Sequence, residues 1–323
     1  MSTTPIVGLH HVTAIASDPQ RNLDFYTEVL GLRFVKRTIN FDDPGTYHFY
    51  FGNDIGAPGT ILTFFPWPHA AKGRIGAGEV IATAFSIPVG SWDFWAERLK
   101  TKRVSYTEDR RFDSRILTLS DPDGMILELV EHKEDQAGDA PRFSDISPDK
   151  AIQGFYGVTL LEANLARTEK VLTVMGLQKI AEENGIARFA PEGASLGRFI
   201  DVKIDPAAAV GRMGTGTVHH IAFRNPDDAA QAEWRKVLSR FLSVTPVQDR
   251  TYFHSIYFRE PGGVLFEMAT DNPGFLIDEP IESLGEALRI PEWYEPMRPQ
   301  IEARLTPLEL HKASQDSPAG VSR

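Results

Sequence analysis

The 323-residue sequence contains no cysteine and has fewer basic than acidic residues, 34 against 44. Without thiols there is no disulfide framework, no thiolate zinc site and no cysteine nucleophile. The formal net charge is −10, and no block rich in lysine and arginine is present. A phosphate backbone or an anionic membrane surface would require a basic face. We therefore expect neither a nucleic acid nor a membrane as partner.

Long apolar runs are also missing. The opening MSTTPIVGLHHV has no basic start followed by an apolar stretch, so no signal peptide is predicted. No segment approaches the roughly 18 consecutive apolar residues that a membrane span needs. Hydrophobic residues make up 42% of the chain, which is enough for a sizeable core and about two domains. The expected location is the cytoplasm.

One plan of strand, helix and three strands occurs four times along the chain. The first copy begins with LHHVTAIA at 9–16, followed by Asp18 as helix N-cap, Pro19 in the first turn and Gly31 as the helix stop. The other three copies begin at 80–88, 155–163 and 218–226. We call these copies modules. Because one module is too small to bury its sheet face, modules should pair into curved sheets.

The predicted fold class is therefore α+β, with four such modules paired into two cup-shaped, mixed-sheet domains. Modules one and two occupy residues 1–133, and modules three and four occupy 151–275. Residues 134–150, rich in Asp, Ser and Pro, are predicted to link the two halves. Residues 276–323 are predicted to form a C-terminal, helix-containing arm that ends in a disordered tail.

Four of the nine histidines form two doublets, His10-His11 and His219-His220. Both doublets lie in the first strand of a module. Adjacent strand residues point to opposite faces, so only one histidine of each doublet should enter the cup. The remaining histidines, His48, His69, His132, His254 and His311, have no partner at ligand spacing.

Glu267 is a lone carboxylate in an apolar closing strand, where burial without a partner would be costly. A metal ion would neutralise it. Alignment of the turns Pro58-Gly59 and Pro261-Gly262 places Phe64 at the position of Glu267 in module one. We therefore expect an apolar group where a fourth ligand would stand.

Modules two and three have no histidine to match, since Ala82 and Gly157 stand at the doublet positions. Glu128 aligns with Glu267 but has no imidazole beside it, and we interpret it as structural. One complete set remains: the predicted metal ligands are His11, His220 and Glu267. Modules one and four must then pair around the metal. A metal bound by two histidines and one carboxylate, with its other coordination positions open, is typical of non-haem Fe(II) oxygenases.

These motifs resemble the vicinal oxygen chelate superfamily, and within it the family of hydroquinone ring-cleaving dioxygenases. The resemblance covers nearly the whole chain, from GLHHVTA and GLRFVKRT through VHHIAF to DRTYFHSIYFREPGGVLFEMATDNPGF. It implies the same three ligands and an enzyme that cleaves a hydroquinone-type ring with O₂. Fe(II) is the expected metal, with Mn(II) as the alternative. A small aromatic substrate, O₂ and a homodimer are the implied partners.

The resemblance also implies a set of polar residues around the metal: His10, Thr13, His219, Arg250 and Tyr257. Their roles would be to orient the phenolic oxygens, accept a proton and hold superoxide. Strand alternation, however, directs His10 and His219 away from the metal. They either reach the site from the strand edge or only pack and donate hydrogen bonds. Taken alone, Arg250 would be a solvated group and Tyr257 a core residue.

Two other functions compete with the dioxygenase. A glyoxalase-like isomerase or lyase would use a non-redox metal, and in the superfamily that chemistry usually has four protein ligands. Phe64 in the fourth position argues against it. A metal-free binding or sequestering protein on the same fold has little reason to keep all three ligands.

Overall fold

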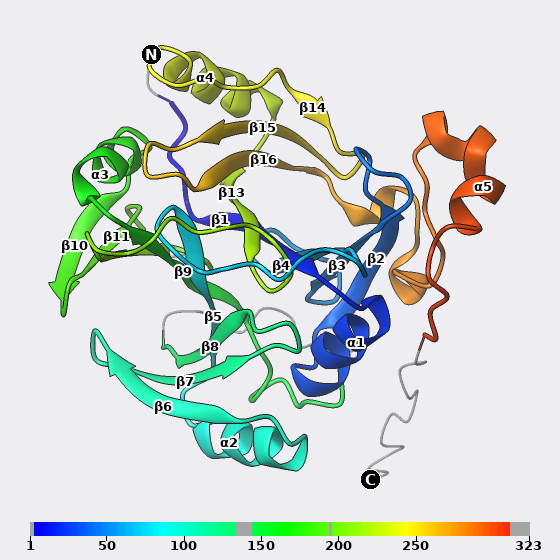
Figure 1. The fold of residues 1–323 in the computed structure, drawn as a ribbon, viewed down its shortest axis with the longest axis horizontal. Helices are drawn as coiled ribbons and strands as arrows, with labels where there is room; N and C mark the ends of the chain where they lie inside the picture. Colours follow the sequence, from blue (N-terminus) through cyan, green and yellow to red (C-terminus); the bar gives the residue numbers. More distant parts are fainter. Residues whose placement is uncertain (1–2, 134–143, 194–195, 311–323) are drawn as a thin grey trace, which may run out of the picture.

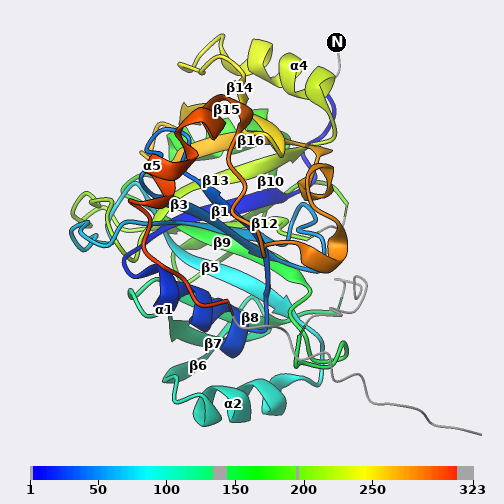
Figure 2. The same cartoon turned by 90° about the vertical axis from the view of Figure 1, so that its right-hand side faces the viewer.

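The protein contains two curled, mixed β-sheets, and a computed structural model describes its residues 3–133, 144–193 and 196–310 (Figure 1). Helices lie on the outside of the sheets. Figure 2 shows α4 (Asp228–Leu238) and α2 (Trp92–Thr101) at opposite ends of the molecule, with strands of both sheets between them. This arrangement confirms the predicted α+β class.

The four modules follow one another along the chain. The first contains β1 (Leu9–Ala16), α1 (Pro19–Asp24), a π-helical turn (Phe25–Val29), β2 (Arg33–Ile39), β3 (Tyr47–Gly52) and β4 (Ile61–Pro66). The second contains β5 (Glu79–Ile87), α2, β6 (Tyr106–Arg111), β7 (Ser114–Ser120) and β8 (Ile126–Glu131). The third contains β9 (Gly154–Glu162), α3 (Leu165–Val174), β10 (Gln178–Glu183), β11 (Ile186–Ala190) and β12 (Phe199–Ile204). The fourth contains β13 (Val218–Asn225), α4, β14 (Gln248–Asp249), β15 (Phe253–Arg259) and β16 (Leu265–Pro273).

Local sequence accounts for the start and end of the first helix. The Asp18 carboxylate accepts a hydrogen bond from the Arg21 amide at 2.8 Å, as an N-cap does, and Pro19 occupies the first turn. Gly31 has φ +67°, the left-handed conformation in which glycine commonly ends helices. Both features match the sequence expectation.

The outer modules share one sheet and the inner modules share the other. The first sheet has the order β14-β15-β16-β13-β1-β4-β3-β2, and the second has the order β10-β11-β12-β9-β5-β8-β7-β6. In each sheet an antiparallel pair, β1 with β13 or β5 with β9, joins the two modules. Along the sequence, modules one and two are followed by modules three and four. In the structure, modules one and four form one sheet, and modules two and three form the other.

Each sheet has a helix-covered face and a face that lines the cup. In β4, Leu62 and Phe64 belong to the large hydrophobic core, and the Phe64 ring lies 4.6 Å from that of Tyr26. Thr63 and Phe65 alternate with them and therefore face the cup.

Two β-bulges interrupt the pairing of β1 with β13. Leu9 pairs with Phe223 and His11 with Ala222, so His10 is an extra residue in β1. On the partner strand, His219 is the extra residue, because the register shifts between Thr13 and Ala14. A bulge redirects side chains that regular alternation would send to the other face. Both bulges fall on a histidine doublet.

A C-terminal arm follows the fourth module and borders the first sheet (Figure 1). Its helical segments are Phe275–Ile277, Ile281–Ser283, Glu292–Met297 and α5 (Arg298–Glu302). Lys36 of β2 is fully buried, and its ammonium group binds the carboxylates of Asp278 and Glu279, both at 2.5 Å. The predicted disordered tail and most of the predicted linker lie outside the described residues.

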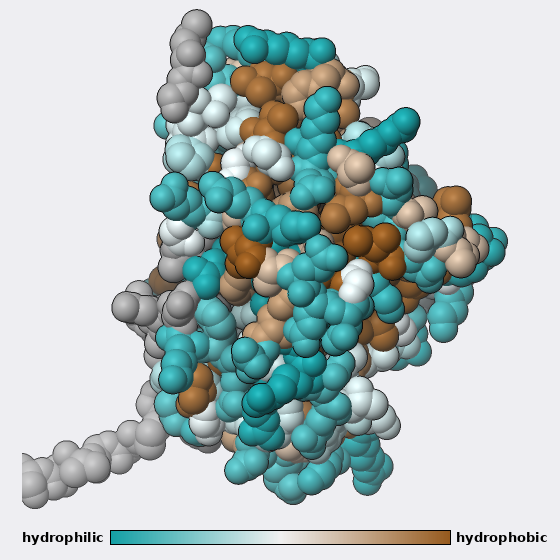
Figure 3. Space-filling view, turned by 90° about the vertical axis from the view of Figure 1, so that its left-hand side faces the viewer, coloured by the Kyte–Doolittle hydropathy of each residue, from teal (hydrophilic) through white to brown (hydrophobic). Residues whose placement is uncertain are grey.

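The face in Figure 3 carries hydrophobic side chains interspersed among hydrophilic ones. Exposed hydrophobic residues include Val174 of α3 and Ile180 of β10. Among the described residues, no helix is long and apolar enough to cross a membrane. The homodimer suggested by the resemblance stays a prediction.

Candidate metal centre

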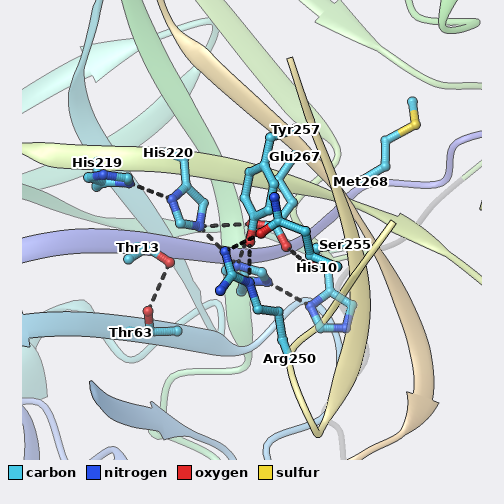
Figure 4. Close-up of polar contacts among 12 residues, drawn as sticks. His10, Thr13, Thr63, His219, His220, Arg250, Ser255, Tyr257, Glu267 and Met268 are labelled. Carbon is cyan, nitrogen blue, oxygen red and sulfur yellow. Dashed lines mark hydrogen bonds and ion pairs between the residues drawn. The ribbon is translucent and has the colours of Figure 1, made fainter. Parts of the chain in front are cut away.

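Three buried side chains from the two joined modules converge on one point. The Nε2 atoms of His11 and His220 lie 3.3 Å apart, and Glu267 Oε2 lies 3.2 Å from the first and 2.8 Å from the second. His11 comes from β1, His220 from β13 and Glu267 from β16. Within the described part of the chain, no other group of histidine and acidic side chains has the spacing of a metal site. Figure 4 shows this cluster and its polar neighbours.

The near-equal sides of this triangle fit one metal ion. Two ligand atoms about 2.1 Å from a metal and about 90° apart lie about 3 Å from each other. A meridional arrangement would instead lengthen one side to about 4.2 Å. The three sides observed, 2.8 to 3.3 Å, match one face of an octahedron. The opposite face would remain open to other ligands.

Glu267 is fully buried, and its two oxygens have different surroundings. Oε1 accepts a hydrogen bond from the Ser255 hydroxyl, whereas Oε2 lies beside the two imidazoles and is paired with no other hydrogen-bond donor. Burial alone would raise the pKa of Glu267, but His11 and His220 hold this pKa well below its ordinary value. The carboxylate is therefore ionised, with one oxygen directed at the metal position.

The other histidine of each doublet contacts the predicted ligand beside it. His10 Nδ1 lies 2.9 Å from His11 Nδ1, and His219 Nδ1 lies 2.7 Å from His220 Nδ1. Burial lowers the pKa of His10 well below its ordinary value and that of His219 to about 3, so both rings are neutral. Each can therefore accept the Nδ1 hydrogen of a histidine whose Nε2 faces the metal, an arrangement that fixes ligand orientation.

This placement corrects the expectation from strand alternation. Regular alternation would direct His10 and His219 away from the metal, and the sequence left open whether they reach the site; the bulges turn both rings toward the ligand histidines. Both rings therefore lie within hydrogen-bond distance of the predicted ligands and are not held only by packing. The sequence gives no sign of the bulges, because one extra residue does not disturb an apolar strand pattern.

Tyr257 and Arg250 form a polar pair beside the triangle. Tyr257 lies opposite Glu267 in the pairing of β15 with β16, and its ring centroid is 5.6 Å from that of His220. Arg250 Nε donates to the Tyr257 hydroxyl at 3.2 Å, and the guanidinium also binds Gln248 at 2.6 Å. Burial raises the pKa of Tyr257, so its own hydrogen remains available for donation.

Thr63, and not Phe64, occupies the position in module one that corresponds to Glu267. Each closing strand pairs in parallel with the opening strand of its module, and both Glu267 and Thr63 pair with the residue two positions after the predicted ligand histidine. The alignment of the Pro-Gly turns was wrong by one position, because module one has one residue fewer between turn and strand. Thr63 donates a hydrogen bond to Thr13 Oγ1 at 2.8 Å (Figure 4).

The second cup has no comparable cluster among its described residues. Ala82 and Gly157 stand where the ligand histidines stand in the first cup, as predicted. Glu128 is the counterpart of Glu267, and it pairs with Arg111 through contacts of 3.1 and 2.6 Å. This pairing fits the structural role that we assigned to Glu128.

Sequence reasoning missed several residues around the triangle. Ser255 was not considered, although it follows a strand pattern that places it on the same face as Tyr257. His48 was set aside, yet its Nε2 lies 2.9 Å from Thr63 Oγ1. Alternation along β3 and β4 could have placed His48 and Thr63 on the cup face. His254, in contrast, lies 2.5 Å from Asp228 of α4 and does not join the site.

The fold agrees with that of related proteins. Residues 8–129 match the model of the Glyoxalase/Bleomycin resistance protein/Dioxygenase superfamily. The chain is also 49% identical over 308 residues to the Bacillus subtilis protein "Putative ring-cleaving dioxygenase MhqO", covering 95% of this chain and 98% of the relative. The chain belongs to this superfamily, and within it to the family of proteins named ring-cleaving dioxygenases.

Two further relatives extend this comparison. The chlorohydroquinone/hydroquinone 1,2-dioxygenase of Sphingobium indicum is 34% identical over 312 residues, covering 92% of this chain and 95% of the relative. A crystal structure described as a putative dioxygenase from Bacillus subtilis superposes with a TM-score of 0.91 at 48% identity, covering 96% of this chain and 99% of the other.

The triangle predicts that the two ends of the chain contribute equally to metal binding. His11→Ala and His220→Ala should each reduce bound metal to a small fraction of one ion per chain, because either change removes one of three ligands. Metal content of the purified, Fe(II)-loaded protein measures this. His254→Ala, outside the site, should keep full occupancy. Stoichiometric metal in the His11→Ala protein would contradict the pairing of modules one and four around the metal.

Proposed function

We propose that this protein is a metal-dependent dioxygenase that cleaves hydroquinone-type aromatic diols and inserts both atoms of O₂. The observation that carries this proposal is the facial triangle of His11, His220 and Glu267. A metal held by these three residues would keep open positions for a diol oxygen and O₂ together. The names of the relatives support the same reaction and the same class of substrate.

Fe(II) is the proposed metal, with Mn(II) as the alternative, because both accept two imidazoles and a carboxylate. When bound, such a metal supplies open coordination positions and a redox couple for the reaction between the ring and O₂. The protein itself supplies the orientation of the ligands. His10 and His219 fix the two imidazoles, and Ser255 fixes the carboxylate.

Tyr257 is the proposed proton donor and acceptor for a substrate oxygen. Its hydroxyl accepts from Arg250, which leaves its own hydrogen free to point at the diol. Arg250 also places a positive charge beside the open face, where oxygen atoms gain negative charge as electrons leave the ring. Both side chains are largely withdrawn from solvent, so these interactions act in a medium of low polarity.

The diol ring needs an apolar wall, and Phe65 provides one. Phe65 is half-buried, faces the cup, and has its ring centroid 4.4 Å from that of His48 and 5.7 Å from that of His219. We infer that the substrate ring packs against Phe65 in an offset or edge-to-face manner. On the other side, Phe253 packs 5.0 Å from His11 and keeps water away from that ligand.

Thr63 at the fourth position also weighs against an isomerase of the glyoxalase type. Its hydroxyl is neutral and engaged with Thr13 and His48, so it offers no anionic or imidazole ligand. The counterpart of Glu267 is thus Thr63 and not Phe64, but neither side chain supplies a fourth metal ligand. The preference for a site with three protein ligands is unchanged.

Oxygen consumption tests the proposed reaction. Fe(II)-loaded protein, prepared anaerobically, should consume one O₂ per molecule of methylhydroquinone in an oxygen electrode. Oxygen uptake should be slower with catechol or gentisate. The Mn(II)-loaded protein, measured in parallel, identifies the working metal. Glu267→Gln should remove the activity, whereas Glu128→Gln, its counterpart in the second cup, should retain it. No oxygen uptake with any diol, despite one bound metal per chain, would refute the dioxygenase.

Tyr257→Phe tests the proton role. This variant should keep its metal and lose about 10²- to 10⁴-fold in kcat, the usual contribution of a general acid or base. Steady-state oxygen uptake with methylhydroquinone provides the measurement. Tyr26→Phe, which removes a buried hydroxyl bonded to Asp121 on the helix side, is the matched control. An unchanged kcat in Tyr257→Phe would show that another group moves the proton.

A further inference from the structure

A chain of four hydrogen-bonded side chains crosses the cup face of the first sheet. The Tyr50 hydroxyl lies 2.8 Å from His48 Nδ1, and His48 Nε2 lies 2.9 Å from Thr63 Oγ1. Thr63 Oγ1 lies 2.8 Å from Thr13 Oγ1. Tyr50, Thr63 and Thr13 are almost fully buried, so none of them can exchange its partner freely with water.

This series of hydrogen bonds ends beside the metal centre. Thr13 follows His11 by two residues in β1, so both side chains lie on the same face of the sheet. Thr13 is also directly opposite His220 in the pairing of β1 with β13. Figure 4 shows the Thr13–Thr63 hydrogen bond next to His220. The last hydroxyl of this series of hydrogen bonds therefore lies on the face that carries His11, directly across from His220.

The four groups have one favoured hydrogen-bond direction. Burial, together with the neighbouring histidines, lowers the pKa of His48 well below its ordinary value, so its ring is neutral, with one donor and one acceptor nitrogen. A phenol is a better donor than an aliphatic alcohol, and an imidazole nitrogen is a better acceptor than a hydroxyl oxygen. Tyr50 therefore donates to Nδ1, and Nε2–H donates to Thr63.

Thr63 then donates to Thr13, because its oxygen already receives the His48 hydrogen. With this direction the Thr13 hydroxyl accepts from Thr63, and its own hydrogen has no acceptor among the hydrogen bonds of the described residues. The reverse direction would instead leave the Tyr50 hydrogen unpaired, and because a phenol is the stronger donor of the two end hydroxyls, this would cost more free energy. The His48 ring is held between Tyr50 at 4.1 Å and Phe65 at 4.4 Å, so it cannot easily turn over.

We propose that His48 is a positioning residue: through Thr63 it fixes the Thr13 hydroxyl so that its hydrogen is donated to an oxygen of the bound aromatic diol. This inference rests on the proposed function, since it names a specificity contact for that substrate. It assigns a task to a histidine that has no place in the metal triangle. It also explains why a threonine, and not an apolar residue, stands at the counterpart of Glu267.

Anaerobic binding of methylhydroquinone to the metal-loaded protein tests the inference by a double-mutant cycle. His48→Phe keeps the aromatic packing and removes both hydrogen bonds, and Thr13→Val removes the final donor. Each should weaken binding about tenfold, the value of one hydrogen bond. Because His48 acts through Thr13, the double variant should bind no more weakly than either single variant. An additive loss of about 100-fold in the double variant would overturn the proposal.

Two further variants exclude a merely structural effect. His48→Gln retains a donor and an acceptor and should recover most of the affinity, whereas His254→Phe, the same change outside the cup, should have no effect. Metal content must remain one ion per chain in all variants. A loss in His48→Gln as large as that in His48→Phe would overturn the proposal.

A metal-free measurement provides an independent reading. Long-range ¹H–¹⁵N spectra of the unloaded protein should show His48 as the neutral tautomer with hydrogen on Nε2, and the opposite tautomer would overturn the inference. If the wild-type protein fails to bind the diol, the proposed function and this inference both fail. If the wild type binds and the cycle is additive, only the inference fails.

Discussion

The antiparallel pairing of β1 with β13 is the contact on which the rest of the site depends. It joins the first and last modules, and it places the Nε2 atom of His11 3.3 Å from the Nε2 atom of His220. A bulge in each strand then turns the neighbouring histidine, His10 or His219, toward the same side. The result is two imidazoles, each held at Nδ1 and each presenting Nε2. Glu267 completes the triangle because β16 pairs in parallel with β13.

The two cups follow one plan but neutralise their buried carboxylates in different ways. In the second cup, Asp201 has the register of Thr63, and it binds Arg188 through contacts of 2.7 and 2.8 Å. Glu128 binds Arg111 in the same cup. Two guanidinium groups thus balance two acids there, and the described residues of this cup contain no group with the spacing of a metal site. In the first cup a single carboxylate faces two imidazoles, which is the ligand arrangement that a divalent metal completes.

Much of this arrangement could be predicted because it leaves marks in the sequence. Repeated strand and helix patterns indicated four modules, and an isolated Glu267 in an apolar strand indicated a neutralising partner. Finer features leave no such mark. Bulges and strand register depend on backbone pairing between distant segments, so the alternation rule failed for the first histidine of each doublet. The turn alignment likewise selected Phe64 when the register selects Thr63. The role of His48 depends on partners from three strands, which no local pattern reveals.

The central claim is that one metal binds where the two ends of the chain meet. Anomalous diffraction from crystals of the Fe(II)-loaded protein, collected on both sides of the iron absorption edge, locates that metal directly. We predict a single strong peak within bonding distance of His11 Nε2, His220 Nε2 and Glu267 Oε2. A peak at other residues, or a fully loaded protein with no peak between these three atoms, would contradict the account.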